Sequence, residues 1–232
     1  MLRVIRPFDL KRRLAAEALG SALLASVVVG SGIMAQRLCG AGPGGDGLAL
    51  LANALATGVG LLALILAFGP VSGAHFNPAV SLAFLLTGKL RRAHAGAYAL
   101  AQTGGMIAGV LATHAMFGLR LVQASAHARN GGPQLLSEAI GTFTLVSVIL
   151  LADRLDARRT PYAVAALVTG GYWFTASTFF TNPAITLARS LTDTFAGIRP
   201  ADAPAFIAVE CASAVLAAGF ARWLFKHHPV EA

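Results

Sequence analysis

Two stretches of this chain read alike: NPAVSLAFLLT, which begins at Asn77, and NPAITLARSLT, which begins at Asn182. They align without a gap, so that Val80 falls on Ile185. Such a match indicates one structural unit used twice. Asparagine is a favoured residue just before a helix, and proline fits the first helical turn. The repeat therefore predicts two short helices, each with an asparagine at the positive end of its dipole.

The rest of the chain is strongly apolar. Hydrophobic residues make up 56% of the 232 positions, charged residues only 12%, and the mean hydropathy is +0.68. This composition argues against a soluble globular protein. Two short stretches, 77–86 and 182–191, cannot cross a bilayer and are typical of re-entrant half-helices. Six runs of about 20 residues are long enough to span, and they cover residues 14–36, 48–69, 93–118, 135–152, 162–180 and 203–223.

The basic residues of the chain lie mostly between these apolar runs. The net charge of +8 does not point to nucleic acid as a partner, because these residues sit in the loops of a membrane chain. If the N-terminus is cytoplasmic, thirteen of the 18 Lys and Arg residues face the cytoplasm. The positive-inside rule then predicts that both termini are cytoplasmic. The remaining five face outward: Arg37, Arg120, Arg129, Arg189 and Arg199.

The internal repeat extends beyond the short stretches. AAEALG in the first span resembles LSEAIG in the fourth, so Glu17 matches Glu138, and Gln102 in the third span pairs with Glu210 in the sixth. Each half then has three full spans and one half-helix, so the halves enter the membrane from opposite sides. Inverted repeats of this kind place irregular backbone at the midplane, where it lines a cavity. We expect one domain over residues 1–232, with repeats at about 12–118 and 134–226.

Paired Asn-Pro-Ala boxes in a six-span chain resemble the aquaporin/aquaglyceroporin family (major intrinsic proteins). The first box lies in SGAHFNPAV, and AEALG and AQTGG in the first and third spans add to the resemblance. It implies an all-α membrane protein: six tilted helices around a pore, two half-helices meeting at its centre, and a homotetramer. The implied pore motif residues are Asn77, Pro78, Ala79, Asn182, Pro183 and Ala184.

At the centre of such a pore, Asn77 and Asn182 would offer amide donors to a passing hydroxyl oxygen. The two facing helix N-termini would raise an electrostatic barrier to cations and interrupt a proton wire. The alternative is that both asparagines only cap their helices. The two roles are compatible, and the symmetry of the pair favours donation to the pore. Pro78 and Pro183 have a structural role at the first turn.

The outer constriction departs from the family pattern. An arginine usually follows the second box directly, whereas this chain has Ile185 there. Arg189 lies four residues on, about 6 Å nearer the outside on the same helix face. Counting back from the boxes places the other constriction positions at Thr57, Gly170 and Phe179. Such a ring is wide and lacks a fixed cation, so it should admit larger neutral solutes.

The same pattern resembles a bacterial subgroup associated with arsenic detoxification. That resemblance implies passage of glycerol-type polyols and of metalloid acids such as arsenite or methylated arsenicals, besides water, across a bacterial inner membrane. A water-selective aquaporin is the alternative within the channel class. A coupled secondary transporter is a further alternative, although the midplane offers amides rather than carboxylates. An enzyme is not expected, and neither a cofactor nor a metal site is indicated by the sequence.

Five other polar residues have more than one interpretation. His75 could orient water along the inner pore, gate the pore by protonation, or only brace its loop. Arg189 could be a vestibule residue or a rim arginine reaching to water. Glu17 and Glu138, buried in apolar helices, are expected to accept hydrogen bonds from the re-entrant loops rather than to relay protons. Glu210 is either protonated or paired with a loop amide.

Overall fold

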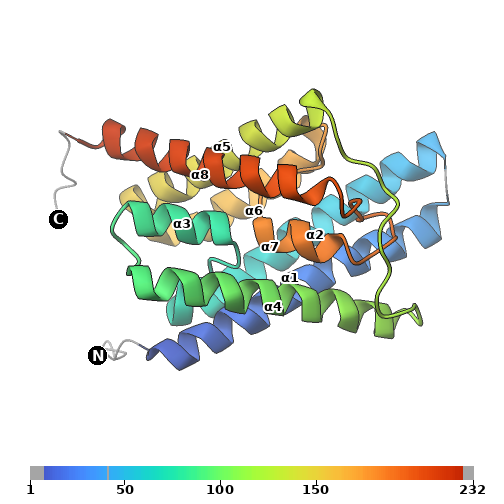
Figure 1. Ribbon diagram of the computed structural model, residues 1–232, viewed down its shortest axis with the longest axis horizontal. Helices are drawn as coiled ribbons and strands as arrows, with labels where there is room; N and C mark the ends of the chain where they lie inside the picture. Colours follow the sequence, from blue (N-terminus) through green and yellow to red (C-terminus); the bar gives the residue numbers. More distant parts are fainter. Residues whose placement is uncertain (1–7, 41, 227–232) are drawn as a thin grey trace.

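Helices form every regular element in the computed structural model, which describes residues 8–40 and 42–226. Figure 1 shows the long helices running roughly along one axis, with two short helices between them. In chain order the elements are α1 (Leu10–Cys39), α2 (Pro43–Ser72), α3 (Pro78–Leu86), α4 (Arg92–Met116), α5 (Gly132–Asp156), the 3-10 turn η1 (Ala157–Arg159), α6 (Thr160–Phe174), α7 (Pro183–Arg189) and α8 (Ala203–Leu224).

Five helical stretches in this described part of the chain are long and apolar enough to cross a membrane. One of them, Gly132–Phe174, is 43 residues long and contains both α5 and α6, joined through η1. It therefore holds two of the six predicted spans, and the all-α membrane fold class is confirmed. The fifth span ends at Phe174 rather than at Phe180, because the chain leaves the helix there and runs without regular structure to the second box.

The two halves of the chain pack in the same way. α1 packs against α2 and α4, α5 packs against α6 and α8, and α2 meets α6 between the halves. Glycines allow the closest of these crossings. A Cβ atom added to Gly105 or Gly109 of α4 would lie 2.1 Å from a backbone oxygen of α1, so only glycine fits at either position. Such small residues let membrane helices approach closely.

The two half-helices, α3 and α7, lie inside this frame. Figure 1 shows them end to end near the middle of the molecule, each packed on α4 and α8. Their starts are capped as the repeat predicts: Asn77 and Asn182 are the N-caps, and a proline follows each. α1 begins and α8 ends at the same end of the molecule (Figure 1).

The outer surface of the helices is apolar. Leu100 on α4 is 78% exposed and Trp223 on α8 is 69% exposed, among many large apolar side chains that face outward. The polar side chains Glu17, Gln102 and Glu138 are instead fully buried. Polar groups inside and apolar groups outside is the arrangement that a bilayer requires. The site therefore lies within the helix frame.

Candidate functional site

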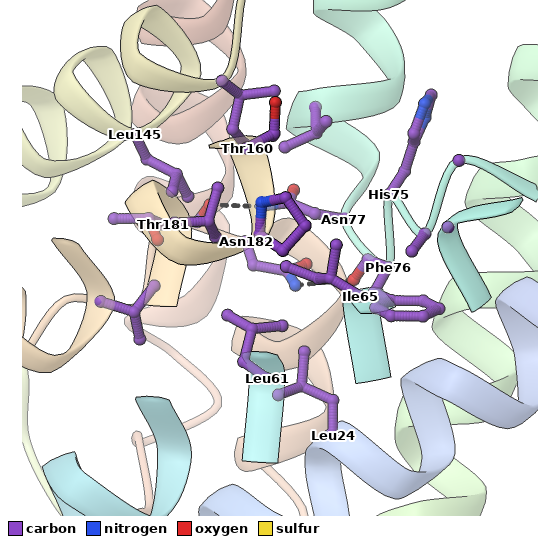
Figure 2. A pocket seen from close by; sticks show the side chains of 18 of the residues that line it. Leu24, Leu61, Ile65, His75, Phe76, Asn77, Leu145, Thr160, Thr181 and Asn182 are labelled. Carbon is purple, nitrogen blue, oxygen red and sulfur yellow. Dashed lines mark hydrogen bonds between the residues drawn. The ribbon is translucent and has the colours of Figure 1, made fainter. Parts of the chain in front are cut away.

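The asparagines of the two boxes bind the opposite half of the molecule. Asn77 Nδ2 donates to the carbonyl oxygen of Thr181 at 2.8 Å, and Asn182 Nδ2 donates to that of Phe76 at 2.9 Å. Figure 2 shows both bonds crossing between the loops. These contacts place the N-terminal tips of α3 and α7 against each other. The sequence predicts such a meeting of the two boxes. In the structure, both asparagines line one cavity.

Each asparagine side chain makes two kinds of hydrogen bond. Its Oδ1 atom caps its own helix, accepting from the N–H of Ala79 at 2.8 Å in the first box and of Ala184 at 3.0 Å in the second. One of its two amide N–H bonds is used across the molecule. A primary amide carries a second N–H bond, which neither of these cross-loop hydrogen bonds uses. Capping a helix therefore does not prevent these amides from donating to the pore, as the sequence analysis expects.

The loops before the boxes are held in a strained form. Ala74 and Phe76 before the first box, and Thr178, Phe179 and Thr181 before the second, have φ between 47° and 61°. This left-handed region costs a residue other than glycine roughly 1 kcal/mol or more. It turns the carbonyl groups of Phe76 and Thr181 toward the opposite asparagine. The surrounding structure must therefore stabilise the loops strongly.

Two buried glutamates provide part of this stabilisation. Glu17 accepts hydrogen bonds from the backbone N–H groups of His75 at 3.0 Å and Phe76 at 2.8 Å. Glu138 accepts from those of Phe180 at 3.0 Å and Thr181 at 2.7 Å. Hydrogen bonds to charged groups are roughly twice as strong as neutral ones. This is the structural arrangement that the symmetric placement of Glu17 and Glu138 predicts.

A cavity of about 660 Å³ passes along the two boxes. It is lined by residues from Asp153 and Arg158, close to η1, as far as Arg189 at the end of α7. Apolar side chains dominate the walls, and Figure 2 shows Leu24, Leu61, Ile65 and Leu145 around the asparagines. A mostly apolar wall with a few aligned hydrogen-bond donors suits small polar solutes without charge.

The expected constriction positions are only partly brought together. Thr57, Phe179 and Ile185 all line the cavity, but Gly170 does not. Gly170 is exposed on the outer face of α6 with no neighbouring atom within 4 Å of an added Cβ atom. Tyr172 lines the cavity in its place, and its hydroxyl lies 3.2 Å from that of Thr57.

The helix period explains this difference. Two residues along a helix lie about 200° apart, so Gly170 and Tyr172 cannot face the same side. Ungapped counting back from the second box takes no account of where α6 ends and the irregular chain begins, so it selects the wrong residue of α6. Gly171, between these two residues, packs against the Phe179 side chain instead: an added Cβ atom would lie 2.4 Å from the Phe179 ring.

Comparison with known proteins agrees with this geometry. A family described as "Major intrinsic protein" matches residues 5–180, which is more than half of the chain. The chain belongs to the major intrinsic protein family. As a member of this channel family it is a membrane channel and not an enzyme.

Individual relatives support the same assignment. The chain is 50% identical over 222 residues to an aquaglyceroporin, AqpS, of Rhizobium meliloti, covering 96% of this chain and 94% of that one. It is 39% identical over 108 residues to the lens fiber major intrinsic protein of Gallus gallus, covering 47% and 38%. The crystal structure of the aquaglyceroporin from Plasmodium falciparum has the same fold, with a TM-score of 0.71, 21% identity and 95% and 97% coverage.

Arg189 of this major intrinsic protein is buried rather than at the rim. Its side chain is only 3% exposed, its Nε atom donates to the carbonyl oxygen of Ala196, and it lines the cavity. The guanidinium carbon lies 3.4 Å from the centre of the Phe180 ring. A side chain held in this way does not reach out to water. The vestibule interpretation of Arg189 therefore fits the structure, and the rim interpretation does not.

Arg129 also holds the outer part of the channel, and sequence reasoning did not single it out. It donates from Nε to Gly197 at 2.8 Å and from Nη1 to Ser177 at 3.2 Å, and it lies 5.0 Å from the centre of the Phe180 ring. Phe180 therefore contacts two guanidinium groups, one from the long outer loop and one from α7. No pattern in the sequence marks Arg129 among the outward arginines, because its partners are far away along the chain.

His75 lies on the inner side of the boxes. Its Nδ1 atom is 3.1 Å from Ser81 Oγ, and its ring packs against Phe84 and Tyr98. It also lines the cavity (Figure 2). These contacts are those of a residue that braces its loop, and His75 also faces the cavity. In residues 8–40 and 42–226 there is no group of three or more His, Cys, Asp or Glu that could hold a metal ion.

Proposed function

We propose that this chain is a passive channel for small uncharged solutes: glycerol-type polyols, metalloid acids such as arsenite or methylated arsenicals, and water. The observation that carries the proposal is the position of Ile185. It follows the second box directly, is buried and lines the cavity, while Arg189 is bound to Ala196 one turn further on. The name aquaglyceroporin, printed for the relative from Rhizobium meliloti, agrees with it.

The chemistry of the cavity supports neutral polar cargo. Asn77 and Asn182 each keep one N–H bond for a solute oxygen, and Thr57 and Tyr172 add hydroxyl groups further out. Ile185 in the place of an arginine removes a planar array of five donors and its bulk from the ring. Arsenous acid is a neutral, polyol-like molecule at neutral pH. It offers several hydroxyl groups to these donors and acceptors, as glycerol does.

Tyr172 favours the water-selective alternative. Its phenol ring occupies the cavity wall where a glycine was expected, and a larger side chain narrows the ring. Whether larger solutes pass therefore depends on whether Ile185 widens the ring more than Tyr172 narrows it. The loss of the arginine at the ring is the larger change, since it removes both side-chain volume and a strong array of hydrogen-bond donors for water.

The test is a comparison of solute fluxes in proteoliposomes. Stopped-flow light scattering is measured with water, glycerol, urea and arsenous acid for the wild type and for Ile185→Arg. We expect Ile185→Arg to reduce glycerol and arsenous acid flux about tenfold and water flux much less. Ile185→Leu, which keeps side-chain volume, is the matched control and should leave all fluxes unchanged. Equal solute flux in Ile185→Arg and the wild type would contradict the proposed ring.

A passive mechanism is tested in the same vesicles. Downhill flux of arsenous acid should be unchanged by a proton uncoupler. Loss of flux on adding the uncoupler would favour the coupled transporter instead.

We also propose that the channel is a homotetramer in a bacterial inner membrane, with both termini cytoplasmic. The apolar outer surface of the helices supports the membrane location, and the basic residues on one predicted side support the orientation. The homotetramer is what the family resemblance implies. Native mass spectrometry in detergent should give four copies per particle. Lys226→Cys in a Cys39→Ser, Cys211→Ser background should be labelled by an impermeant maleimide only after the cells are opened. Labelling of intact cells would contradict this orientation.

A further inference from the structure

The buried glutamates Glu17 and Glu138, which support the loops before the two boxes, have different neighbours in the two halves of the channel. In the first half Gln102 Nε2 donates to Glu17 Oε2 at 2.8 Å and to Ser81 Oγ at 2.9 Å. This amide gives the buried carboxylate a donor from α4. In the second half the position of Gln102 is taken by Glu210, on α8. A glutamate can replace this amide donor only if it carries a proton.

Glu210 is fully buried, and its two oxygens differ. Oε1 accepts from the backbone N–H of Asn182 at 3.2 Å and from Thr186 Oγ1 at 2.7 Å. Oε2 receives no N–H or O–H donor from the described part of the chain. The backbone N–H groups of two consecutive residues, Thr181 and Asn182, donate to Glu138 Oε2 and to Glu210 Oε1, so the carboxyl groups of α5 and α8 lie side by side. Ionised carboxyl groups can only accept hydrogen bonds, so two of them side by side cannot hydrogen-bond to each other unless one carries a proton.

No cation neutralises this pair directly. Two buried cations interact electrostatically with these acids: Arg189 on α7 with both of them, and Arg129 on the outer loop with Glu138. Arg189 is bound to Ala196 and Arg129 to Gly197 and Ser177, and within residues 8–40 and 42–226 neither guanidinium forms an ion pair with a carboxylate. Two adjacent buried carboxylates cannot both ionise without a compensating charge. A single proton shared by the pair removes this repulsion.

The proton belongs on Glu210 rather than on Glu138. Each oxygen of Glu138 already accepts a backbone N–H bond from the loop before the second box, and these bonds are strongest to an ionised group,. The free Oε2 of Glu210 has no such bond to lose.

We propose that Glu210 is protonated at neutral pH and donates from Oε2 to Glu138, in the role that the Gln102 amide has toward Glu17. Each half of the channel then holds one negative charge behind its loop and one neutral donor. Glu210 is thus a positioning residue for the second box, because its Oε1 fixes the backbone of Asn182. Neither acid lines the cavity, so this proton is outside the solute path.

Infrared spectroscopy tests the proposal independently of which solutes pass. The difference spectrum of wild type minus Glu210→Gln is recorded in proteoliposomes at pH 7, where a glutamate in water is ionised. We expect a protonated-carboxyl C=O band in the wild type that is missing from Glu210→Gln. Absence of this band at pH 7, or its persistence in Glu210→Gln, would overturn the assignment.

Solute flux gives the second readout. A glutamine amide supplies an N–H donor and a carbonyl acceptor where a protonated glutamate supplies an O–H donor and a carbonyl acceptor. Glu210→Gln should therefore keep water and glycerol flux within about twofold of wild type. Glu210→Leu, which has neither group, should lose about tenfold or more. A Glu210→Gln channel as impaired as Glu210→Leu would show that Glu210 acts as an ionised group, against the proposal.

The mirror variant Gln102→Glu is the matched control in the first half. It creates the same acid pair beside Glu17, and it should add a second protonated-carboxyl band. If Gln102→Glu folds and adds no such band, an acid pair in this geometry does not hold a proton, and the argument for Glu210 fails with it.

Discussion

The hydroxyl oxygen of Tyr172 lies 3.2 Å from that of Thr57 on the wall of the channel cavity. The two residues come from α6 and α2, which belong to different halves of the inverted repeat. Their hydrogen bond joins the halves at the level of the outer ring. It therefore connects the width of the ring to the packing between the two repeats.

Shortening Tyr172 should widen the ring. We expect Tyr172→Ala to raise the ratio of glycerol to water permeability severalfold, because it removes the phenol ring from the cavity wall. Tyr172→Phe keeps the ring and loses only the hydrogen bond, which is worth about 1 kcal/mol, so its permeability ratio should stay near that of the wild type. Stopped-flow measurements on proteoliposomes distinguish the two variants.

The control for this prediction is Trp173→Ala on the same helix. Trp173 is 51% exposed on the outside, and its removal should not change the permeability ratio. A lower ratio in Tyr172→Ala would mean that Tyr172 supports the ring rather than narrowing it.

Loss of the Arg189 guanidinium should destabilise the protein. Arg189→Ala removes a charge-assisted hydrogen bond to Ala196 and a stacked cation on Phe180, a loss of roughly 3 kcal/mol in the free energy of unfolding. Arg189→Lys should recover only part of it, because an ammonium group does not stack as a planar guanidinium does. Arg120→Ala, at an exposed loop position, is the control. Unfolding in detergent, followed by circular dichroism, gives the comparison.

Two adjacent glycines of α4 should differ sharply. An added Cβ atom at Gly105 would lie 2.1 Å from the backbone oxygen of Ala18, so Gly105→Ala should force α1 and α4 apart and cost about 1–3 kcal/mol in the free energy of unfolding,. Gly104 has no atom within 4 Å of that position. Gly104→Ala should be neutral or slightly stabilising, because alanine favours a helix more than glycine does. Equal unfolding midpoints for the two variants would contradict the close crossing.

The outer loop should become less ordered at acidic pH. The hydrogen bond from Arg199 lowers the pKa of the Asp202 carboxyl, which also accepts from the backbone N–H of Arg129 at 2.9 Å. A lowered pKa in the folded state contributes stability above the unfolded value of about 3.9, and this stability is lost as pH falls below that value through the lowered pKa. Hydrogen exchange at the Arg129 amide should therefore be slow and steady from pH 7 down to about 4 and increase below it, after correction for intrinsic exchange rates.

Asp202→Asn provides the comparison for this loop. It cannot ionise, so corrected protection of the Arg129 amide should be lower than in the wild type at pH 7 and should not depend on pH. A wild-type loop with the same protection at pH 3 and pH 7 would exclude Asp202 as its anchor.

Local sequence was sufficient to predict the spans and the two half-helices. Apolar length marks a membrane helix, and Asn-Pro marks a helix start, wherever the rest of the chain lies. The repeat added the symmetric placement of Glu17 and Glu138 against the two loops. All of these depend on residues that are neighbours in the sequence or on copies of one pattern.

The composition of the outer ring could not be obtained in this way. Gly170 and Tyr172 are two residues apart in the chain, but they face opposite sides of α6. Which of them reaches the cavity depends on where α6 ends and how the chain returns to the second box. Arg129 shows the same limit, because its contacts with Ser177 and Gly197 join segments about 50 to 70 residues away in the chain.

The sequence by itself determined an inverted pair of three-span repeats with two asparagine-tipped half-helices, because hydropathy, caps and repeats are properties of short segments. Only the tertiary structure decided which side chains share the cavity, that Arg189 is buried beneath Phe180, and that Glu210 lies beside Glu138. These depend on rotation about helix axes and on loop paths, where one residue of register moves a side chain by about 100°.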